Sequence, residues 1–243
     1  MTPVAQAYVH TAQFPDQRVL DRWGKIAGTL SYEIAKEIFP AGTEIEISLE
    51  PGSLKTKAKV AMGALLAAYG AIATYPEFKR GLSEAILDAR QFAGTFNDNF
   101  LKFTGIARED VVRKERRTEV PGRLTRALDD LERLERNLVI LPRPQIEEEL
   151  RSIAYRLRVG LSELGPAERT LAVDLIESQH LPQLPRLVAP KFALRPDEYE
   201  VAYNLKLDDP GSEGPAPGYR ALISTDNPSR GLPHLPWLPG ARD

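Results

Sequence analysis

The sequence predicts an α+β protein, in which an N-terminal helix and a β-hairpin with a buried apolar helix are followed by a mostly helical bundle and an irregular, proline-rich end. Three observations predict this class. Residues 44–60 alternate polar and apolar side chains around a Pro-Gly pair, as a β-hairpin does. Several stretches between 17 and 181 repeat apolar residues every three or four positions, which is typical of amphipathic helices. The range 182–239 holds 11 of the 20 prolines, and proline disrupts regular helix.

The first predicted helix covers 17–39. Asp16 can cap its first turn, and Pro40 ends it. Its apolar stripe has helical spacing and consists of Val19, Trp23, Ile26, Leu30 and Ile34. The short apolar segment 7–14 before this helix is a candidate strand. These elements begin an N-terminal α+β domain, which we place at 1–76.

The predicted hairpin, 44–60, has one register that suits both of its faces. A two-residue loop would place Leu49 opposite Leu54 on the apolar face and Glu46 opposite Lys57 on the solvent face. Pro-Gly favours a type II turn, whose twist suits hairpins poorly, so a slightly longer loop is also compatible with the sequence. A slip of one residue would turn every side chain to the wrong face.

The segment 60–75 follows the hairpin and carries 16 residues without a charge. We expect it to form a buried core helix, because about 24 Å of helix is shorter than the bilayer core of about 30 Å. Gly63, Ala67 and Ala71 would lie on one side of this helix at four-residue spacing. Small residues so placed allow another backbone to approach closely, either the hairpin of the same chain or a second copy. Insertion into a membrane after a trigger is the alternative for this segment.

The range 77–181 is predicted to form a helical domain. Three apolar stripes run through it, and the last two are heptad-like and separated only by 139–143, which predicts an antiparallel helical hairpin. A further short helix is expected at 167–179. The stripes begin at Phe78, Val120 and Ile146.

The C-terminal range 182–243 is predicted to be irregular, with two candidate short strands at 200–205 and 219–224. Its final residues set Leu235 and Trp237 among prolines, so they would sample extended, polyproline-like conformations. Apolar residues in such a segment can dock in a groove with little loss of conformational entropy. We expect this tail to dock on its own domain or on a partner.

Catalytic and metal-binding patterns are missing from the sequence. The chain has no cysteine, and no second histidine lies within four residues of any of the 3 histidines, so a zinc site is not expected. No nucleophile elbow, phosphate-binding loop, dinucleotide fingerprint or zinc-protease motif occurs. His180 follows a helix end and is predicted to be a cap or a surface residue. We therefore predict no catalytic residues, no cofactor and no metal.

One basic segment, 108–126, stands out from a chain of net charge -2. It carries seven positive and four negative side chains, and we expect it to join two helices. Its charges could form internal salt bridges, meet an acidic partner or bind nucleic-acid phosphates. No aromatic residue interleaves with the arginines, which argues against stacking of single-stranded bases. The candidate binding residues are Arg113, Arg116, Arg117 and Arg123.

These observations predict a non-enzymatic protein-interaction or assembly module, a subunit of a larger bacterial complex that binds a protein partner or itself. The first 15 residues lack a secretory pattern, so we expect a cytoplasmic protein. Two other function classes compete. One is a membrane-acting or toxic effector that uses the apolar helix 60–75, and the other is a nucleic-acid-associated protein that uses the basic segment 108–126.

Overall fold

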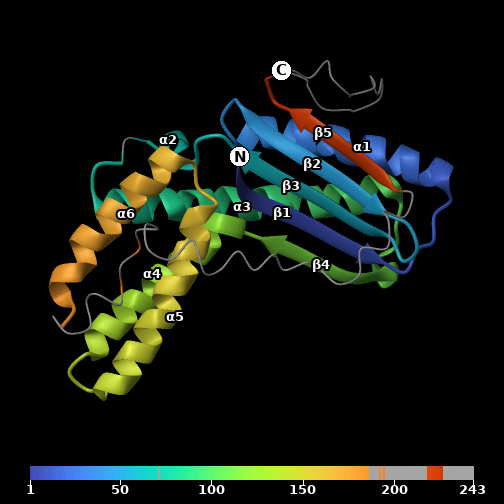
Figure 1. Cartoon of the computed structure of the whole chain (residues 1–243). Coiled ribbons are helices and arrows are strands. Elements are labelled where there is room, and N and C mark those ends of the chain that lie inside the picture. Colours follow the sequence, from blue (N-terminus) through green and yellow to red (C-terminus); the bar gives the residue numbers. More distant parts are fainter. Residues whose placement is uncertain (71, 186–191, 193, 195–217, 227–243) are drawn as a thin grey trace.

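The computed structural model describes residues 1–70, 72–185, 192, 194 and 218–226, which form an α+β fold (Figure 1). One five-stranded antiparallel sheet has the strand order β4-β1-β3-β2-β5. Its strands are β1 (Thr2–Thr11), β2 (Thr43–Glu50), β3 (Lys55–Met62), β4 (Val111–Arg117) and β5 (Tyr219–Ser224). The helices are α1 (Gln17–Ile38), α2 (Leu65–Ala68), α3 (Tyr75–Thr104), α4 (Glu119–Asn137), α5 (Arg143–Ser162) and α6 (Pro166–His180). Short 3₁₀ turns occupy Arg108–Asp110 and Leu181–Gln183.

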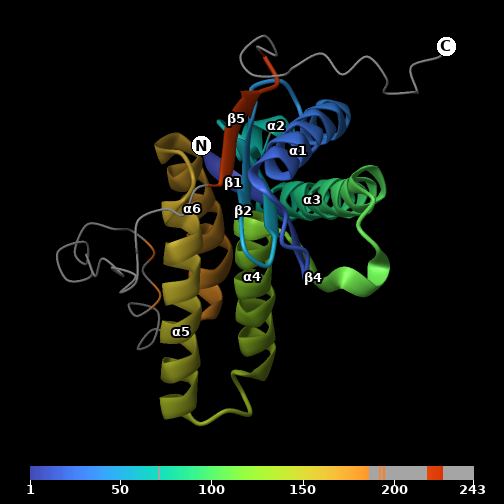
Figure 2. The same cartoon turned by 90° about the vertical axis from the view of Figure 1, so that its right-hand side faces the viewer.

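The helices α1 and α3 lie together on one face of the sheet, as Figure 2 shows. The inward side chains of the central strands, such as Val9 of β1 and Ile47 of β2, are fully buried beneath them. On α3, the rings of Phe92, Phe96 and Phe100 stack in succession, with centroids 6.2 and 5.6 Å apart. The opposite face of the sheet carries mainly charged and polar side chains, as an antiparallel sheet with one solvated face does.

The predicted β-hairpin is confirmed, but its register differs from the two-residue loop by two positions. Leu49 pairs with Thr56 and Glu46 with Lys59, because four residues, 51–54, connect the strands. A shift of two residues keeps every side chain on its predicted face. The apolar residues are therefore buried as expected, and Lys59 meets Glu46 on the solvent face at 3.7 Å.

The predicted apolar helix 60–75 is wrong. Its first residues continue β3 to Met62, because this strand pairs with β1 on one side and β2 on the other. Among the described residues of this range, helix is limited to Leu65–Ala68 and to Tyr75, which begins α3. Gly70 has a positive φ of 107°, a conformation that ends a helix. Among the described residues, no helix is long and apolar enough to cross a membrane.

The N-terminal strand and the basic segment also differ from their predictions. β1 covers Thr2–Thr11, whereas the sequence suggested 7–14, and it lies inside the sheet between β4 and β3. The basic segment 108–126 is not a simple junction between helices, because Val111–Arg117 forms β4 and pairs with β1. The sheet therefore draws strands from all three predicted regions of the chain.

The candidate strand at 219–224 is confirmed as β5, which pairs with the outer edge of β2. Ile223 is buried, and the Tyr219 ring lies over Gly24 of α1. A Cβ at position 24 would come within 2.3 Å of that ring, so the contact requires glycine. The candidate strand 200–205 and the tail residues Leu235 and Trp237 lie outside the described residues.

The other predicted helices are present. The first helix ends at Ile38, and the Asp16 carboxylate caps it by accepting a hydrogen bond from the Val19 N–H at 2.9 Å. The helices α4 and α5 form the predicted antiparallel hairpin, which projects away from the sheet in Figures 1 and 2. The buried residues of the sheet layer and of the hairpin form one continuous core.

Candidate functional site

The hairpin of α4 and α5 is a rigid arm, because its facing stripes are completely buried. Gly160 of α5 allows the helices to approach closely near the sheet, since a Cβ there would lie 2.7 Å from the Leu124 side chain. The buried residues of α4 are Leu124, Leu128, Leu131 and Leu134, and those of α5 are Ile146, Leu150, Ile153, Leu157 and Leu161.

Two ion pairs join the helices of this arm. Arg123 of α4 binds Glu163 in a bidentate pair, with N···O distances of 2.6 and 2.7 Å. Further along, Arg156 of α5 meets Asp130 of α4 at 2.6 Å. Arg123, one of the predicted partner-binding residues, therefore makes an internal contact at the base of the arm.

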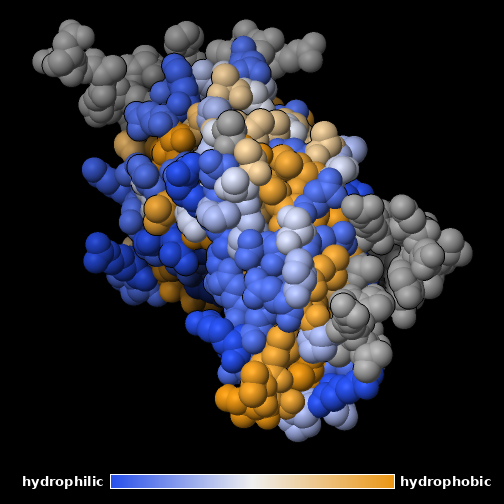
Figure 3. Space-filling model, turned by 90° about the vertical axis from the view of Figure 1, so that its left-hand side faces the viewer, coloured by the Kyte–Doolittle hydropathy of each residue, from blue (hydrophilic) through white to orange (hydrophobic). Residues whose placement is uncertain are grey.

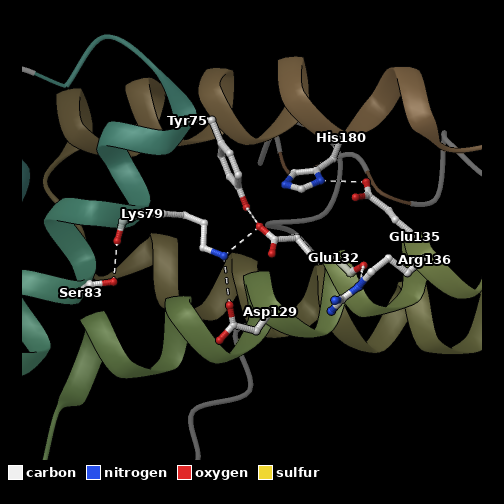
Figure 4. Close-up of polar contacts among 8 residues, drawn as sticks. All are labelled: Tyr75, Lys79, Ser83, Asp129, Glu132, Glu135, Arg136 and His180. Atoms are coloured by element: carbon white, nitrogen blue, oxygen red, sulfur yellow. Dashed lines mark hydrogen bonds and ion pairs between the residues drawn. The ribbon is translucent and has the colours of Figure 1, made fainter.

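A polar network attaches the arm to α3, as Figure 4 shows. The Tyr75 hydroxyl donates a hydrogen bond to Glu132 of α4 at 2.9 Å, and Lys79 binds Glu132 at 2.8 Å and Asp129 at 3.1 Å. Burial opposes the ionisation of Glu132, but the hydrogen bonds from Lys79 and Tyr75 outweigh it and lower the pKa of this carboxyl. Burial and the hydrogen bond to Glu132 raise the pKa of Tyr75. The network therefore favours a charged Glu132 and a neutral Tyr75.

His180 is the last residue of α6 and attaches this helix to the same region. The sequence predicted a cap or a surface residue, and the structure places the side chain in the interior. Its side chain is 1% exposed, and its Nδ1 lies 2.8 Å from the Glu135 carboxylate. The imidazole meets the Tyr75 ring edge-on, with centroids 4.8 Å apart (Figure 4). Its Nε2 is buried without a hydrogen-bond partner in the described part of the chain. This geometry suits a bracing contact between α3, α4 and α6.

Beside this network lies a shallow polar depression of about 310 Å³. Glu132, Glu135, Arg136 and Gln183 line it. Within the described ranges, no group of three or more histidine, cysteine or acidic side chains could hold a metal ion. The depression therefore offers polar contacts but no metal centre.

The outer end of the arm, residues 138–141, exposes a group of apolar side chains that we call the hairpin tip. Val139 is 97% exposed and Ile140 is 78% exposed, the highest values for large apolar residues in the described part of the chain. Leu138 and Leu141 turn inward and pack against the core. The tip accounts for the apolar surface at the bottom of Figure 3. Four consecutive apolar residues thus divide into two that anchor the turn and two that face solvent.

The backbone of the hairpin tip is ordered by hydrogen bonds. The N–H groups of Ile140 and Leu141 both donate to the Asn137 carbonyl, at 2.9 and 3.1 Å. The Ile146 N–H donates to the Pro142 carbonyl at 3.1 Å and begins the first turn of α5. Val139 and Ile140 are therefore held in place on a fixed turn rather than on a long loop.

The predicted arginines of the basic segment divide between the two faces of β4. Arg113 and Arg117 lie on the solvated face, where both contact Glu115 between them. Arg116 lies on the other face, where a Cβ on Gly94 of α3 would be 3.2 Å from its guanidinium carbon. The predicted internal salt bridges are therefore present. Of the four predicted arginines, only Arg113 and Arg117 lie on the solvated face of the sheet.

The pairing of β1 with β4 brings an aromatic residue next to these arginines, which the sequence did not predict. Tyr8 of β1 pairs with Glu115, and its ring lies under the Arg117 guanidinium, 5.8 Å from centroid to carbon. Tyr8 and Arg117 are more than 100 residues apart, so no local spacing could reveal this contact.

The small residues of the predicted seam do not share a helix face. Gly63 is exposed and precedes α2, and Ala67 is exposed within that single turn. Ala71 lies outside the described residues. The seam that depended on a helix over 60–75 therefore lacks its structural basis.

No protein-family model, curated protein or solved structure matches the chain. The geometry of the hairpin and of the sheet therefore carries the functional argument.

Proposed function

We propose that the protein is a non-enzymatic interaction module that docks through its hairpin tip. The observation that carries this proposal is the joint exposure of Val139 and Ile140 at the end of a rigid arm. Scattered apolar residues are normal on a surface, but adjacent ones at a projecting turn are typical of a contact site. The contacts of Arg123, Glu132 and His180 would hold the arm in one orientation and so reduce the entropy lost on docking. The proposal includes action in the cytoplasm, within a larger assembly.

The chemistry of the network supports a binding role over an enzymatic one. A catalytic histidine needs one nitrogen oriented by a partner and the other open to substrate. His180 has the partner, Glu135, but its Nε2 is buried beside the Tyr75 ring. A substrate could reach this nitrogen only if α3, α4 and α6 separated.

Site-specific photo-crosslinking tests the proposal. A photoreactive amino acid at position 140 should give protein or lipid adducts in cells that express the chain. The same group at position 87 is the matched control, because Leu87 is also exposed, at 63%, but lies on α3 away from the arm. Adducts at 140 that weaken on Val139→Ser would support docking through the tip. The same adducts at both positions, or none at 140, would remove the proposal.

A second candidate function is binding of single-stranded nucleic acid on the solvated face of the sheet. The observation that favours it is Tyr8, which lies between Arg113 and Arg117 and gives a base a ring to stack on. Glu115 lies between the two arginines and offsets part of their charge, so this function ranks second.

Fluorescence anisotropy with a labelled single-stranded 20-mer tests this second function. The double variant Arg113→Glu/Arg117→Glu should lose affinity by at least about tenfold, and Tyr8→Ala by less. Arg220→Glu is the matched control, because Arg220 is exposed on the same face but on β5, at the opposite edge. Binding that is absent, or equal in all variants, would exclude the sheet face as a nucleic-acid site.

A further inference from the structure

The hairpin tip has the shape required to meet a flat surface. In Figures 1 and 2 the turn between α4 and α5 extends further from the sheet than α6 does. The end of the arm, formed by this turn and the adjoining ends of α4 and α5, is therefore the part that would meet such a surface. A convex tip of this kind cannot enclose a ligand, but it can enter a soft, layered surface.

The tip also has the polarity of a membrane-inserting turn. Its two outward side chains, Val139 and Ile140, are purely apolar. The N–H groups of Ile140 and Leu141 are already bonded to the Asn137 carbonyl. The main obstacle to placing a loop at the lipid boundary is that its backbone groups lose their hydrogen bonds to water. The N–H groups of Ile140 and Leu141 avoid this loss, because their bonds are internal. Shallow burial, of about 5–10 Å, is the depth at which interfacial elements lie.

The charged residues nearest the tip in the sequence are both basic, and acidic residues follow only beyond them, at Glu135 and at 147–149. Arg136 and Arg143 bracket it, and no acidic residue lies between them. Arg136 is exposed and donates to a main-chain carbonyl, that of Glu132, at 3.2 Å, so this contact does not neutralise it. Arg143 is 58% exposed and shares its charge with Glu147 at 3.0 Å. Long arginine side chains can place their guanidinium groups at the headgroups while neighbouring apolar residues enter the acyl region.

We propose that the surface bound by the hairpin tip is an anionic lipid bilayer, with Val139 and Ile140 inserted and Arg136 and Arg143 on the headgroups. This inference rests on the proposed function, because it names the partner of the same tip. It differs from the membrane function predicted from the sequence, which required a helix over 60–75.

Vesicle co-sedimentation tests this inference with the full-length chain. The protein should bind vesicles of phosphatidylcholine and phosphatidylglycerol at 3:1, and bind pure phosphatidylcholine at least about tenfold less tightly. Val139→Ser/Ile140→Ser should reduce binding to the anionic vesicles by at least about tenfold. Leu87→Ser is the matched control and should leave binding unchanged. No binding by the wild type, or equal binding by the double variant, would overturn the inference.

A single-cysteine label gives a second measurement, because the chain has no cysteine of its own. An environment-sensitive dye on Ile140→Cys should shift to the blue when anionic vesicles are added, and the same dye on Leu87→Cys should not. Equal shifts at both positions would contradict insertion of the tip.

The outcomes separate this inference from the proposed function. Protein adducts at position 140 without vesicle binding would leave the docking function standing and remove the lipid surface. A dimer in light scattering that dissociates in Val139→Ser/Ile140→Ser would assign the tip to a second copy of the chain and also overturn the lipid proposal. If there are no adducts at position 140 and no binding to vesicles, both the docking function and the lipid proposal are removed.

Discussion

The solvated face of the sheet and the tip of the α4–α5 hairpin expose different kinds of side chain to water. On the sheet face several charges are paired: Lys57 lies 2.6 Å from Glu50, and Lys59 lies 3.7 Å from Glu46. At the edge, β4 carries exposed arginines, which discourage pairing with another chain. The hairpin tip instead exposes Val139 and Ile140. The sheet face is therefore mostly polar, although Leu222 is exposed on it, whereas the tip places two exposed apolar residues next to each other. Variants in the core, at the α6 contact, at Glu132 and at the tip would test this contrast.

The largest effect is expected in the core beneath the sheet. Phe96→Ala should lower the free energy of unfolding by about 3–5 kcal/mol, because it leaves a cavity between two stacked rings. Urea denaturation followed by circular dichroism measures this. Leu87→Ala, on the exposed side of the same helix, should change the free energy by less than about 0.5 kcal/mol. Similar losses for both variants would mean that α3 is not packed as described.

The next effect is expected at the bracing contact of α6. His180→Ala should lower the free energy of unfolding by about 2–3 kcal/mol. It removes a buried ring and leaves the Glu135 carboxylate, 11% exposed, without this partner. Glu135→Gln should cost less, since an amide can still bond to the imidazole. Thermal unfolding of the two variants compares them. A negligible loss for His180→Ala would indicate that α6 does not brace the arm.

Glu132 should make the attachment of the arm sensitive to acid. Its pKa in the folded protein lies below the ordinary value of 4.5, so its contribution to stability is present above about pH 4.5 and is lost as the pH falls through the lowered pKa. Glu132→Gln should lower the free energy of unfolding by about 1 kcal/mol at neutral pH. The effect is modest because the Glu132 side chain is 34% exposed. Unfolding measured from pH 7 to 3 should show the two proteins converging in acid. A difference in the free energy of unfolding that stays constant from pH 7 to 3 would contradict a stabilising role of the charged Glu132.

The smallest effect on stability is expected at the hairpin tip. Val139→Ser/Ile140→Ser should change the free energy of unfolding by less than about 0.5 kcal/mol, because both side chains already lie in water. The same variant should lose surface binding. Loss of stability and binding together would mean that the tip supports the fold, and the contrast with the sheet would then fail.

The sequence predicted the elements whose signal is local. Stripes such as Leu124, Leu128 and Leu131 bury one face of a helix at helical spacing, and the structure places them so. The hairpin 44–60 was found for the same reason, although its loop length depends on turn geometry that the alternation does not specify. The helix predicted over 60–75 is wrong because apolar composition alone does not distinguish the end of a buried strand from a core helix.

The parts of the candidate sites that could not be predicted depend on distant partners. β4 contains almost no alternating apolar residues, and it becomes a strand because its backbone pairs with β1. His180 and Glu135 lie 45 positions apart, so their contact follows from how α4 and α6 pack. The tip residues 138–141 are visible in the sequence as the link between two helices. Their exposure becomes evident only once the arm is seen to project from the fold.

The position of β5 has a consequence for how this chain is made. Leu49 of β2 pairs with Tyr219, 170 residues later, so the outer edge of β2 has no strand beside it until the ribosome has added the intervening residues. At typical elongation rates this takes roughly 10–30 s. During that time the nascent sheet presents an open edge whose inward side chains include Ile45 and Ile47. Pairing of residues 219–224 with β2 closes this edge, so a chain without them would retain a sheet edge available to other chains.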